Sequence, residues 1–167
     1  RGSVIPLFIS QIRSGKPVTI TDPNMTRFLM SLSESIDLVE YAFENAKPGD
    51  LFVKKAPATT LENLAKALIE LFGNDETQIQ TIGFRHGEKL YESLLGAEER
   101  VRSKDLGNYF KVEMDSRDMN YAEFFDSGSG SQLNHSAYTS HNTEQLNVEQ
   151  TKKLLVELPE IRKVLEL

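Results

Sequence analysis

The sequence predicts an α/β fold, and three observations support this. Short apolar runs typical of strands alternate with longer segments whose apolar residues recur every three to four positions, as in helices. Apolar residues make up 39% of the chain and charged residues 26%, which is ordinary for a globular protein. At 167 residues the chain has the length of one domain, or of part of a larger protein. We therefore expect one core built from strands and helices together.

The first elements follow from local patterns. Helical apolar spacing, with Pro6 in the first turn, predicts a helix over residues 4–14. Residues 17–21 (Pro-Val-Thr-Ile-Thr) indicate a strand, and Asp-Pro-Asn at 22–24 is turn chemistry. The apolar run over residues 26–32 is then expected to be extended.

Helix-capping patterns mark the next two helices. Ser31 and Glu34 have capping-box spacing before a helix that is expected to end near Asn45. After a strand over residues 51–55, a second pattern of this kind begins at Thr59.

Glycines and prolines punctuate the rest of the chain. Gly73 is the expected stop of the second capped helix. A strand over residues 78–83, a helix over 90–102 and a strand over 108–114 follow. Two short C-terminal helices are expected to divide at Pro159.

These elements suggest three regions. Residues 1–126 form the main portion, the glycine- and serine-rich segment 127–147 is a polar loop or linker, and residues 148–167 form the C-terminal helices.

Composition excludes several classes of function. The net charge of −6 argues against a nucleic-acid-binding surface. The absence of cysteine excludes disulfides, thiolate catalysis and cysteine-based zinc sites, and we expect no metal. No apolar run approaches the roughly 20 residues of a membrane span, and no signal peptide is seen, so a cytoplasmic location is expected. The chain begins at Arg1 and enters a helix at once, which suggests a fragment.

Residues 85–88, Arg-His-Gly-Glu, follow a predicted strand and allow two interpretations. In a histidine phosphatase, His86 would be the nucleophile, and a second histidine would complete the pocket. Only His135 and His141 lie downstream, and neither follows a predicted strand end, where a catalytic partner would be held rigidly. The sequence therefore favours a binding loop over a phosphatase.

In the binding interpretation, the neighbours of His86 recognise a ligand. The planar guanidinium of Arg85 suits phosphate oxygens, and the Glu88 carboxylate can accept hydrogen bonds from sugar hydroxyls. Gly87 permits the tight turn that brings both side chains to one side. A surface loop with salt bridges stays open as the simpler alternative.

Arg27 is a second candidate ligand-binding residue. It lies on an apolar, extended run, where burying a guanidinium without an anionic partner is costly. We expect Arg27 to face a ligand or a carboxylate; the alternative is a partly exposed arginine whose aliphatic stem is packed.

Several stretches resemble a known family. They are RGSVIPLFISQIRSGKPVTITDPNMTRFLMSL, KAPATTLENLAKAL and GFRHGEKLYESLL, followed by DSRDMNY and YTSHNTEQLNVEQTKKLL. They are similar to the C-terminal half of polysaccharide-biosynthesis proteins of the extended short-chain dehydrogenase/reductase superfamily. This branch includes UDP-N-acetylglucosamine 4,6-dehydratases of the inverting capsular type and UDP-glucose 4-epimerases.

The resemblance implies a substrate-binding portion whose N-terminal Rossmann half, the binder of NAD(P), is absent from this chain. It implies UDP-sugar contacts at Ser3, Val4, Pro6, Arg27, Arg85 and Glu88. The glycine-rich dinucleotide loop and the family's catalytic lysine and tyrosine are not found in this sequence. No catalytic or cofactor-binding residue is therefore assigned here, and the chain alone is expected to be inactive.

The implied activity is that of an enzyme of capsule or surface polysaccharide biosynthesis, either a 4,6-dehydratase (a lyase) or a 4-epimerase (an isomerase). The implied partners are the UDP-sugar, the missing Rossmann half and further copies in a homo-oligomer. A free-standing interaction domain is the alternative from another class.

Overall fold

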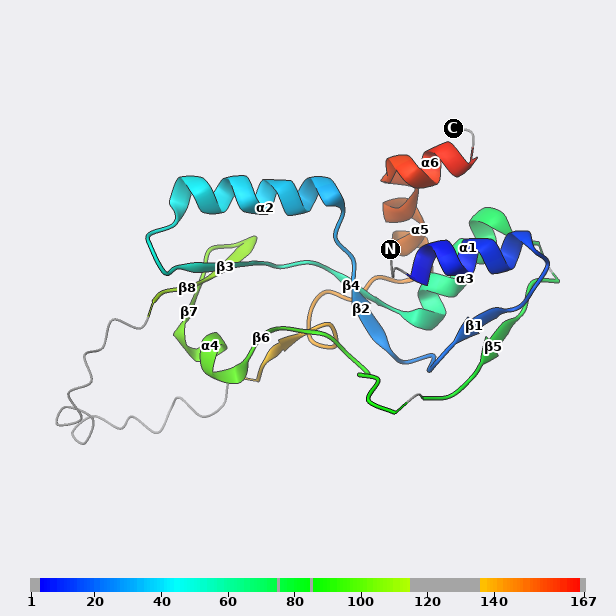
Figure 1. Ribbon diagram of the computed structural model, residues 1–167, viewed down its shortest axis with the longest axis horizontal. Helices are drawn as coiled ribbons and strands as arrows, with labels where there is room; N and C mark the ends of the chain where they lie inside the picture. Colours follow the sequence, from blue (N-terminus) through cyan, green and yellow to red (C-terminus); the bar gives the residue numbers. More distant parts are fainter. Residues whose placement is uncertain (1–3, 75, 85, 115–135, 166–167) are drawn as a thin grey trace. The chain divides into compact units, whose positions relative to one another are not determined.

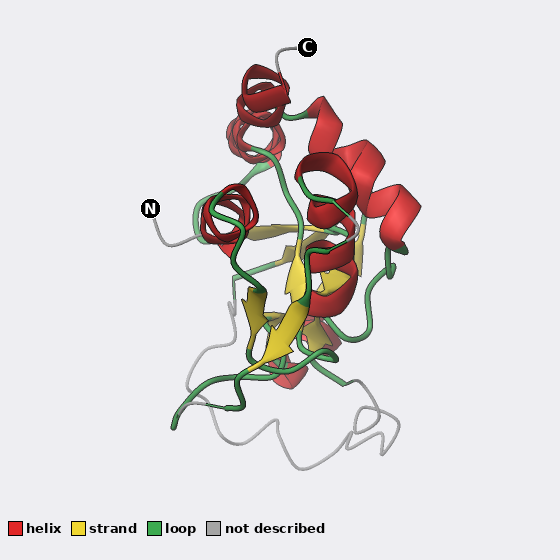
Figure 2. Cartoon of the chain, turned by 90° about the vertical axis from the view of Figure 1, so that its right-hand side faces the viewer, coloured by secondary structure: helices red, strands yellow, loops and turns green. Residues whose placement is uncertain are grey.

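The computed structural model describes residues 4–74, 76–84, 86–114 and 136–165 (Figure 1). Internal contacts divide the chain into two compact units. The first unit consists of Arg1–Ser31, Ala56–Glu92 and Ser140–Leu167, and the second of Leu32–Lys55 and Ser93–Thr139. The helices, strands and connecting loops can be followed in Figure 2.

The first unit combines four helices with two two-stranded sheets. Its elements are α1 (Val4–Arg13), β1 (Val18–Ile20), β2 (Thr26–Phe28), β4 (Ala58–Thr60), α3 (Leu61–Phe72), β5 (Ile79–Thr81), α5 (Val148–Glu157) and α6 (Pro159–Leu165). Strand β1 pairs in parallel with β5, and β2 pairs antiparallel with β4. The predicted split of the C-terminal helices at Pro159 is confirmed.

Helix α3 is central to the core of the first unit. Its buried face, which includes Leu64 and Leu68, packs with α1 and α5, and Phe8 and Leu155 join the same apolar cluster. Full burial of side chains of this size supplies much of the stability of a small core. The amphipathic pattern read from the sequence is therefore the pattern that folds this unit.

The cap of α3 differs from the prediction by one residue. The helix is capped by Thr60, whose hydroxyl oxygen accepts the N–H of Asn63, and not by Thr59. Thr59 is fully buried in β4, where its hydroxyl contacts Leu146 and Thr151. The strand takes Thr59 and leaves the next threonine for the helix. Gly73 follows the last helical residue, as predicted.

The second unit consists of a three-stranded sheet packed against one helix, together with a strand pair and a second, short helix. Its elements are α2 (Leu32–Asn45), β3 (Leu51–Lys54), β6 (Ser93–Leu95), α4 (Ala97–Arg102), β7 (Ser103–Asp105), β8 (Tyr109–Val112) and β9 (Tyr138–Thr139). Strands β3, β8 and β7 form an antiparallel sheet, and β6 pairs with β9. The ring of Tyr41 on α2 stacks on Tyr109 of β8, with centroids 4.2 Å apart.

One predicted helix is wrong in its first half. Residues 90–102 were expected to be helical, but β6 occupies Ser93–Leu95 and the helix begins only at Ala97. Gly96 separates the two, and its N–H donates to the Glu99 side chain at 2.8 Å. This cap starts α4 about two turns later than apolar periodicity suggests, since the spacing of Leu90 and Leu94 alone does not distinguish a strand from a helix.

Other predictions fall partly outside the description. Of the predicted linker 127–147, residues 127–135 lie outside the described residues, while the described part contains β9 and a bridge between Gln145 and Ala58. Strands of two or three residues, such as β4, β7 and β9, are too short to produce a periodic pattern. Among the described residues, no helix is long and apolar enough to cross a membrane.

Asp50 provides an electrostatic test of the second unit. Its carboxylate accepts the N–H of Lys47 at 2.7 Å and pairs with the ammonium of Lys111 on β8 at 2.8 Å. The hydrogen bond from Lys111, followed by that from Lys47, holds the pKa of Asp50 below its usual 3.8. A lowered carboxyl pKa stabilises the fold above its unfolded value, and this stabilisation is lost as the pH falls through the folded value.

We predict that Asp50→Asn lowers the urea midpoint of unfolding at pH 7. The difference in midpoint from the wild type should narrow as the pH falls below about 4, the usual carboxyl range, and on through the lowered folded pKa of Asp50. Urea titrations of both proteins between about pH 7 and pH 3 measure this. Asp37→Asn, at an exposed position of α2, is the matched control. A gap of constant size would contradict the role of the charge.

Candidate functional site

Strand β2 has one edge paired with β4 and one edge covered by residues 88–92, which we call the docked segment. The N–H of Leu61 donates to the carbonyl of Met25, and the N–H of Leu29 donates to the carbonyl of Pro57, each at 2.8 Å. The N–H of Thr26 points to the other edge and donates to Leu90 at 3.0 Å. Because backbone groups alternate between the two edges of a strand, the N–H groups of Thr26 and Phe28 both point toward the docked segment.

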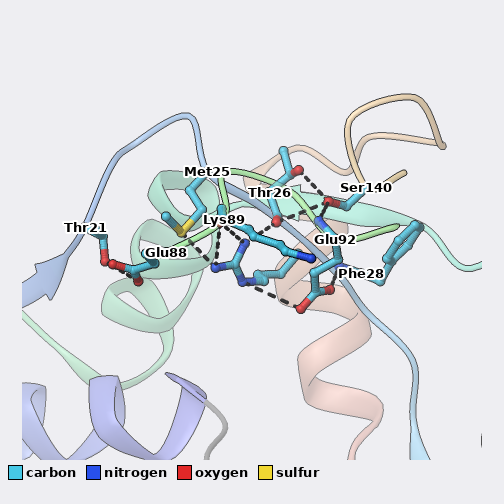
Figure 3. A network of polar contacts seen from close by, with 9 residues as sticks. Thr21, Met25, Thr26, Phe28, Glu88, Lys89, Glu92 and Ser140 are labelled. Atoms are coloured by element: carbon cyan, nitrogen blue, oxygen red, sulfur yellow. Dashed lines mark hydrogen bonds and ion pairs between the residues drawn. The ribbon is translucent and has the colours of Figure 1, made fainter. Parts of the chain in front are cut away.

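The docked segment is held at its C-terminal end by Glu92 and Ser140 (Figure 3). One carboxylate oxygen of Glu92 accepts the N–H of Phe28 at 3.2 Å. The N–H of Glu92 donates to the Ser140 hydroxyl at 2.9 Å, and the N–H of Ser140 donates to the Glu92 carbonyl at 2.8 Å. Side-chain and backbone groups thus complete the strand edge where no regular strand is present.

The guanidinium of Arg27, a residue of β2, contacts both β2 and the docked segment. Its guanidinium donates to the Thr26 carbonyl at 2.8 Å and to the Met25 sulfur at 2.9 Å, and both terminal nitrogens lie 3.4 Å from the Lys89 carbonyl. Its Nε is 3.7 Å from the Glu92 carboxylate. The side chain is 23% exposed. Arg27 was expected to face a ligand or a carboxylate, and the carboxylate that it faces is that of Glu92.

The contacts of Arg27 leave capacity for an anion. Charge-assisted bonds between a guanidinium and a carboxylate are typically about 2.7–2.9 Å long. The distance of 3.7 Å to Glu92 is much longer, and the close acceptors, the Thr26 carbonyl and the Met25 sulfur, are neutral. The guanidinium is thus anchored by neutral groups and only loosely balanced by Glu92.

A pocket of about 200 Å³ opens beside Arg27. Its lining includes Val4 and Leu64 on the apolar side and Arg27 and Glu92 on the polar side. Sites that enclose a drug-sized ligand usually measure roughly 300–1,000 Å³. This pocket could therefore hold only a part of a molecule as large as a nucleotide sugar.

Glu88 lies at the start of the docked segment, after a turn at Gly87. Gly87 has φ +84°, in the left-handed region that favours glycine, so the predicted tight turn is present. The hydroxyl of Thr21 donates to the Glu88 carboxylate at 3.1 Å. The Glu88 carboxylate is therefore oriented by Thr21, the residue that follows β1. The guanidinium of Arg27 contacts the carbonyl of the next residue, Lys89.

Of the other predicted site residues, the structure describes only Val4 and Pro6. Val4 shares the pocket with Arg27, whereas Pro6 is exposed and is not among the lining residues. Ser3 and Arg85 lie outside the described residues.

The histidines show no catalytic arrangement within the described part of the chain. His86 and His141 are both exposed, and no hydrogen bond from a described residue holds either imidazole. The His141 ring lies 4.9 Å from that of Tyr91. His135 falls outside the described residues.

Comparison with known proteins gives the chain its family. Residues 1–114 match the family described as "Polysaccharide biosynthesis protein", and residues 115–162 match "Polysaccharide biosynthesis protein C-terminal". The chain belongs to the polysaccharide biosynthesis protein family. The resemblance inferred from the sequence is confirmed, and so is the α/β fold class.

Individual members of the family agree with this. Proteins named UDP-glucose 4-epimerase from Rickettsia akari (strain Hartford) and Rickettsia prowazekii (strain Madrid E) are 55% and 54% identical over 166 residues. Each match covers 99% of this chain and 48% of the relative, so the chain spans about half the length of these curated relatives. An X-ray structure of Pen from Bacillus thuringiensis matches with a TM-score of 0.75 and 30% identity, over 95% of this chain and 45% of that chain.

Sequence reasoning missed two residues of this site in the polysaccharide biosynthesis protein. Glu92 was placed within a predicted helix, which hid its contact with Arg27. Ser140 lies in the segment predicted to be a polar linker, although Tyr138, Thr139 and Ser140 are all buried. Neither residue belongs to a motif that chemistry alone identifies, because both act through contacts distant in sequence.

The described residues also contain no cluster of three or more histidine, aspartate or glutamate side chains that could hold a metal ion.

Proposed function

We propose that this chain is the substrate-holding half of an NAD(P)-dependent nucleotide-sugar-modifying enzyme. The observation that carries the proposal is the position of Arg27, a guanidinium anchored by neutral groups beside the docked segment that bears Glu88. Membership of the polysaccharide biosynthesis family supports a sugar nucleotide as the ligand. The names of the Rickettsia relatives point to the same class of substrate.

We assign the roles by chemistry. Arg27 and Arg85 bind the diphosphate, since planar guanidinium groups match phosphate oxygens. Glu88 accepts hydrogen bonds from the ribose. For Ser3, Val4 and Pro6, the approach to the nucleotide is what the family resemblance implies. The pocket beside Arg27 holds part of the ligand. The rest of the ligand's surface is covered by protein outside this chain.

NAD(P) is placed on a part of the protein outside this chain. The sequence contains no Gly-x-Gly-x-x-Gly pattern, so its residues do not fit a dinucleotide, and we derive no step through the cofactor. This chain contributes orientation: binding energy from the diphosphate holds the reacting sugar in a fixed place.

Two reactions fit this positioning role. The first is 4,6-dehydration of UDP-N-acetylglucosamine with inversion at C5, supported by the resemblance of the sequence to the inverting capsular branch. The alternative is 4-epimerisation, supported by the names of the Rickettsia relatives. In both, the same half of the protein would hold the UDP portion.

We also propose that α2 contacts the Rossmann half of the same protein. Leu32, Ile36, Val39 and Phe43 are 74%, 51%, 53% and 86% exposed. Their spacing of four, three and four residues places them in one row along the helix. Tyr41, which stacks on Tyr109, lies on the opposite face. A helix with apolar side chains on both faces is typical of an element covered on both sides.

A homo-oligomer in the cytoplasm, with no nucleic acid or membrane partner, completes the proposal. Gel filtration of the full-length protein tests the oligomeric state.

The first prediction about the proposed function concerns UDP binding. In calorimetric titrations of the full-length protein, Arg27→Ala should weaken UDP binding by about tenfold or more, because a charged hydrogen-bond donor is lost. Arg27→Lys should restore only part of the affinity, since it keeps the charge but loses the planar fork. Lys66→Ala is the matched control: Lys66 is an exposed cation of α3 that pairs with Glu62. Unchanged affinity in Arg27→Ala would refute the assignment.

The second prediction separates the two reactions. With UDP-N-acetylglucosamine as substrate, proton NMR of a dehydratase reaction should show a new C6 methyl signal and a 4-keto sugar. An epimerase reaction should instead show the 4-epimer with its C6 hydroxymethyl group intact. Absence of both products with UDP-N-acetylglucosamine and UDP-glucose would remove both activities.

The third prediction concerns α2. Phe43→Ser should destabilise the full-length protein by about 3 kcal/mol if Phe43 becomes buried there. Leu106→Ser, at a loop position of the second unit that is 42% exposed, is the control and should change the stability by no more than about 0.5 kcal/mol. Denaturant unfolding measures both. Equal small effects would show that the row on α2 stays exposed.

A further inference from the structure

Ser140 is a buried polar residue at the centre of the docked segment's contacts. Its exposed fraction is 0%. Its hydroxyl oxygen lies 2.7 Å from the Thr26 hydroxyl, 3.2 Å from the Thr26 carbonyl and 2.9 Å from the Glu92 nitrogen. Its own carbonyl accepts the Gln145 side-chain amide at 2.7 Å. Ser140 therefore joins β2 and the docked segment, which are distant in sequence, from a third segment of the chain (Figure 3).

The polar neighbours of the Ser140 hydroxyl differ in whether they donate or accept hydrogen bonds. A serine hydroxyl has one hydrogen to donate and two lone pairs to accept with. The N–H of Glu92 can only donate, and the carbonyl of Thr26 can only accept. Ser140 therefore accepts from Glu92 and lies within donating distance of the Thr26 carbonyl, while in its 2.7 Å contact with the Thr26 hydroxyl either oxygen can be the donor. One hydroxyl thus has three polar neighbours.

This arrangement reaches Arg27 by two routes. The Thr26 carbonyl that accepts from Ser140 also accepts from the Arg27 guanidinium at 2.8 Å. Glu92, whose N–H Ser140 holds, presents its carboxylate to the other side of the guanidinium. One hydroxyl thus fixes both the neutral anchor of Arg27 and its counter-charge.

We propose that Ser140 is a positioning residue for the diphosphate and ribose contacts. It does not touch the ligand; it locks the docked segment onto β2, so that Arg27 and Glu88 are held in their binding geometry before the ligand arrives. Binding is strengthened when contact groups are preorganised in this way. The inference rests on the proposed function, because it assigns Ser140 to the same site.

The test compares Ser140→Ala with a matched buried hydroxyl elsewhere in the first unit. Thr151 on α5 is also fully buried, and its hydroxyl lies 3.1 Å from that of Thr59. In the full-length protein, Ser140→Ala should weaken UDP binding about five- to tenfold, because the Thr26 hydroxyl, the Thr26 carbonyl and the Glu92 N–H each lose a hydrogen-bond partner and the segment loosens. Thr151→Val should leave the affinity within about twofold, even where it lowers the melting temperature equally.

A double-mutant cycle tests whether Ser140 acts through Arg27. If it does, adding Ser140→Ala to Arg27→Ala should weaken UDP binding by a smaller factor than Ser140→Ala causes in the wild type, because only the Glu88 contact is left to lose, whereas independent sites give multiplied effects. Wild-type affinity in Ser140→Ala, or fully multiplied losses in the double variant, would overturn the proposal. If Ser140→Ala does not fold, Thr26→Val removes one of the same hydrogen bonds with little change of shape and replaces it in the cycle.

Hydrogen exchange separates this proposal from the proposed function. In Ser140→Ala, the amide of Glu92 should exchange about tenfold faster or more, together with other amides of residues 88–92, while the amides of α3 stay protected. If wild-type protein fails to bind UDP, the proposed function is refuted. Unchanged exchange at Glu92 would then refute the lock as well, and faster exchange confined to residues 88–92 would keep it as a positioning device for Arg27.

Discussion

The architecture of the site depends on the unpaired edge of β2. A strand edge buried without partners is costly, and here one edge is satisfied by β4 while the other is satisfied by residues 88–92. These residues do not form a regular strand. The Thr26 N–H finds a carbonyl at Leu90, and the Phe28 N–H finds a carboxylate at Glu92. The need to complete this edge brings the turn at Gly87 and its neighbour Glu88 close to Arg27.

The same constraint explains why charged residues are tolerated on an apolar strand. Arg27 is flanked in sequence by Met25, Thr26, Phe28 and Leu29, and three of these four are buried. Its guanidinium is accommodated because backbone carbonyls at Thr26 and Lys89 receive its N–H groups. Such neutral partners satisfy the donors without cancelling the positive charge. A guanidinium kept in this state is suited to an anionic ligand, since little favourable pairing must be broken for the ligand to bind.

Most regular helices and strands could be predicted from the sequence, because local patterns determine them. Periodicity and helix stops identified α1, α3 and the pair divided at Pro159, and turn chemistry identified the approach to β2. The sequence also drew attention to Arg27, through a charge in an apolar run, and to Glu88, through a glycine turn, and the ligand-binding roles of both residues stay predictions. The Thr60 cap and the late start of α4 were decided by competition between neighbouring elements, which local patterns do not describe. Glu92 and Ser140 depend on contacts across 64 and 114 residues, from Glu92 to Phe28 and from Ser140 to Thr26, and a single sequence contains no signal for such pairs.

The small pocket beside Arg27 and the exposed apolar row on α2 are both consistent with a chain that binds only part of a ligand. A polar network of buried groups is fully satisfied around Ser140, which favours a rigid geometry, yet the pocket beside Arg27 has a volume of only about 200 Å³. A rigid but partial pocket can orient a ligand without enclosing it. Enclosure requires further surface, and the exposed apolar row on α2 shows that the chain also has surface suited to being covered. Both features fit the proposed function, in which this chain recognises the nucleotide and protein outside the chain encloses the reacting sugar.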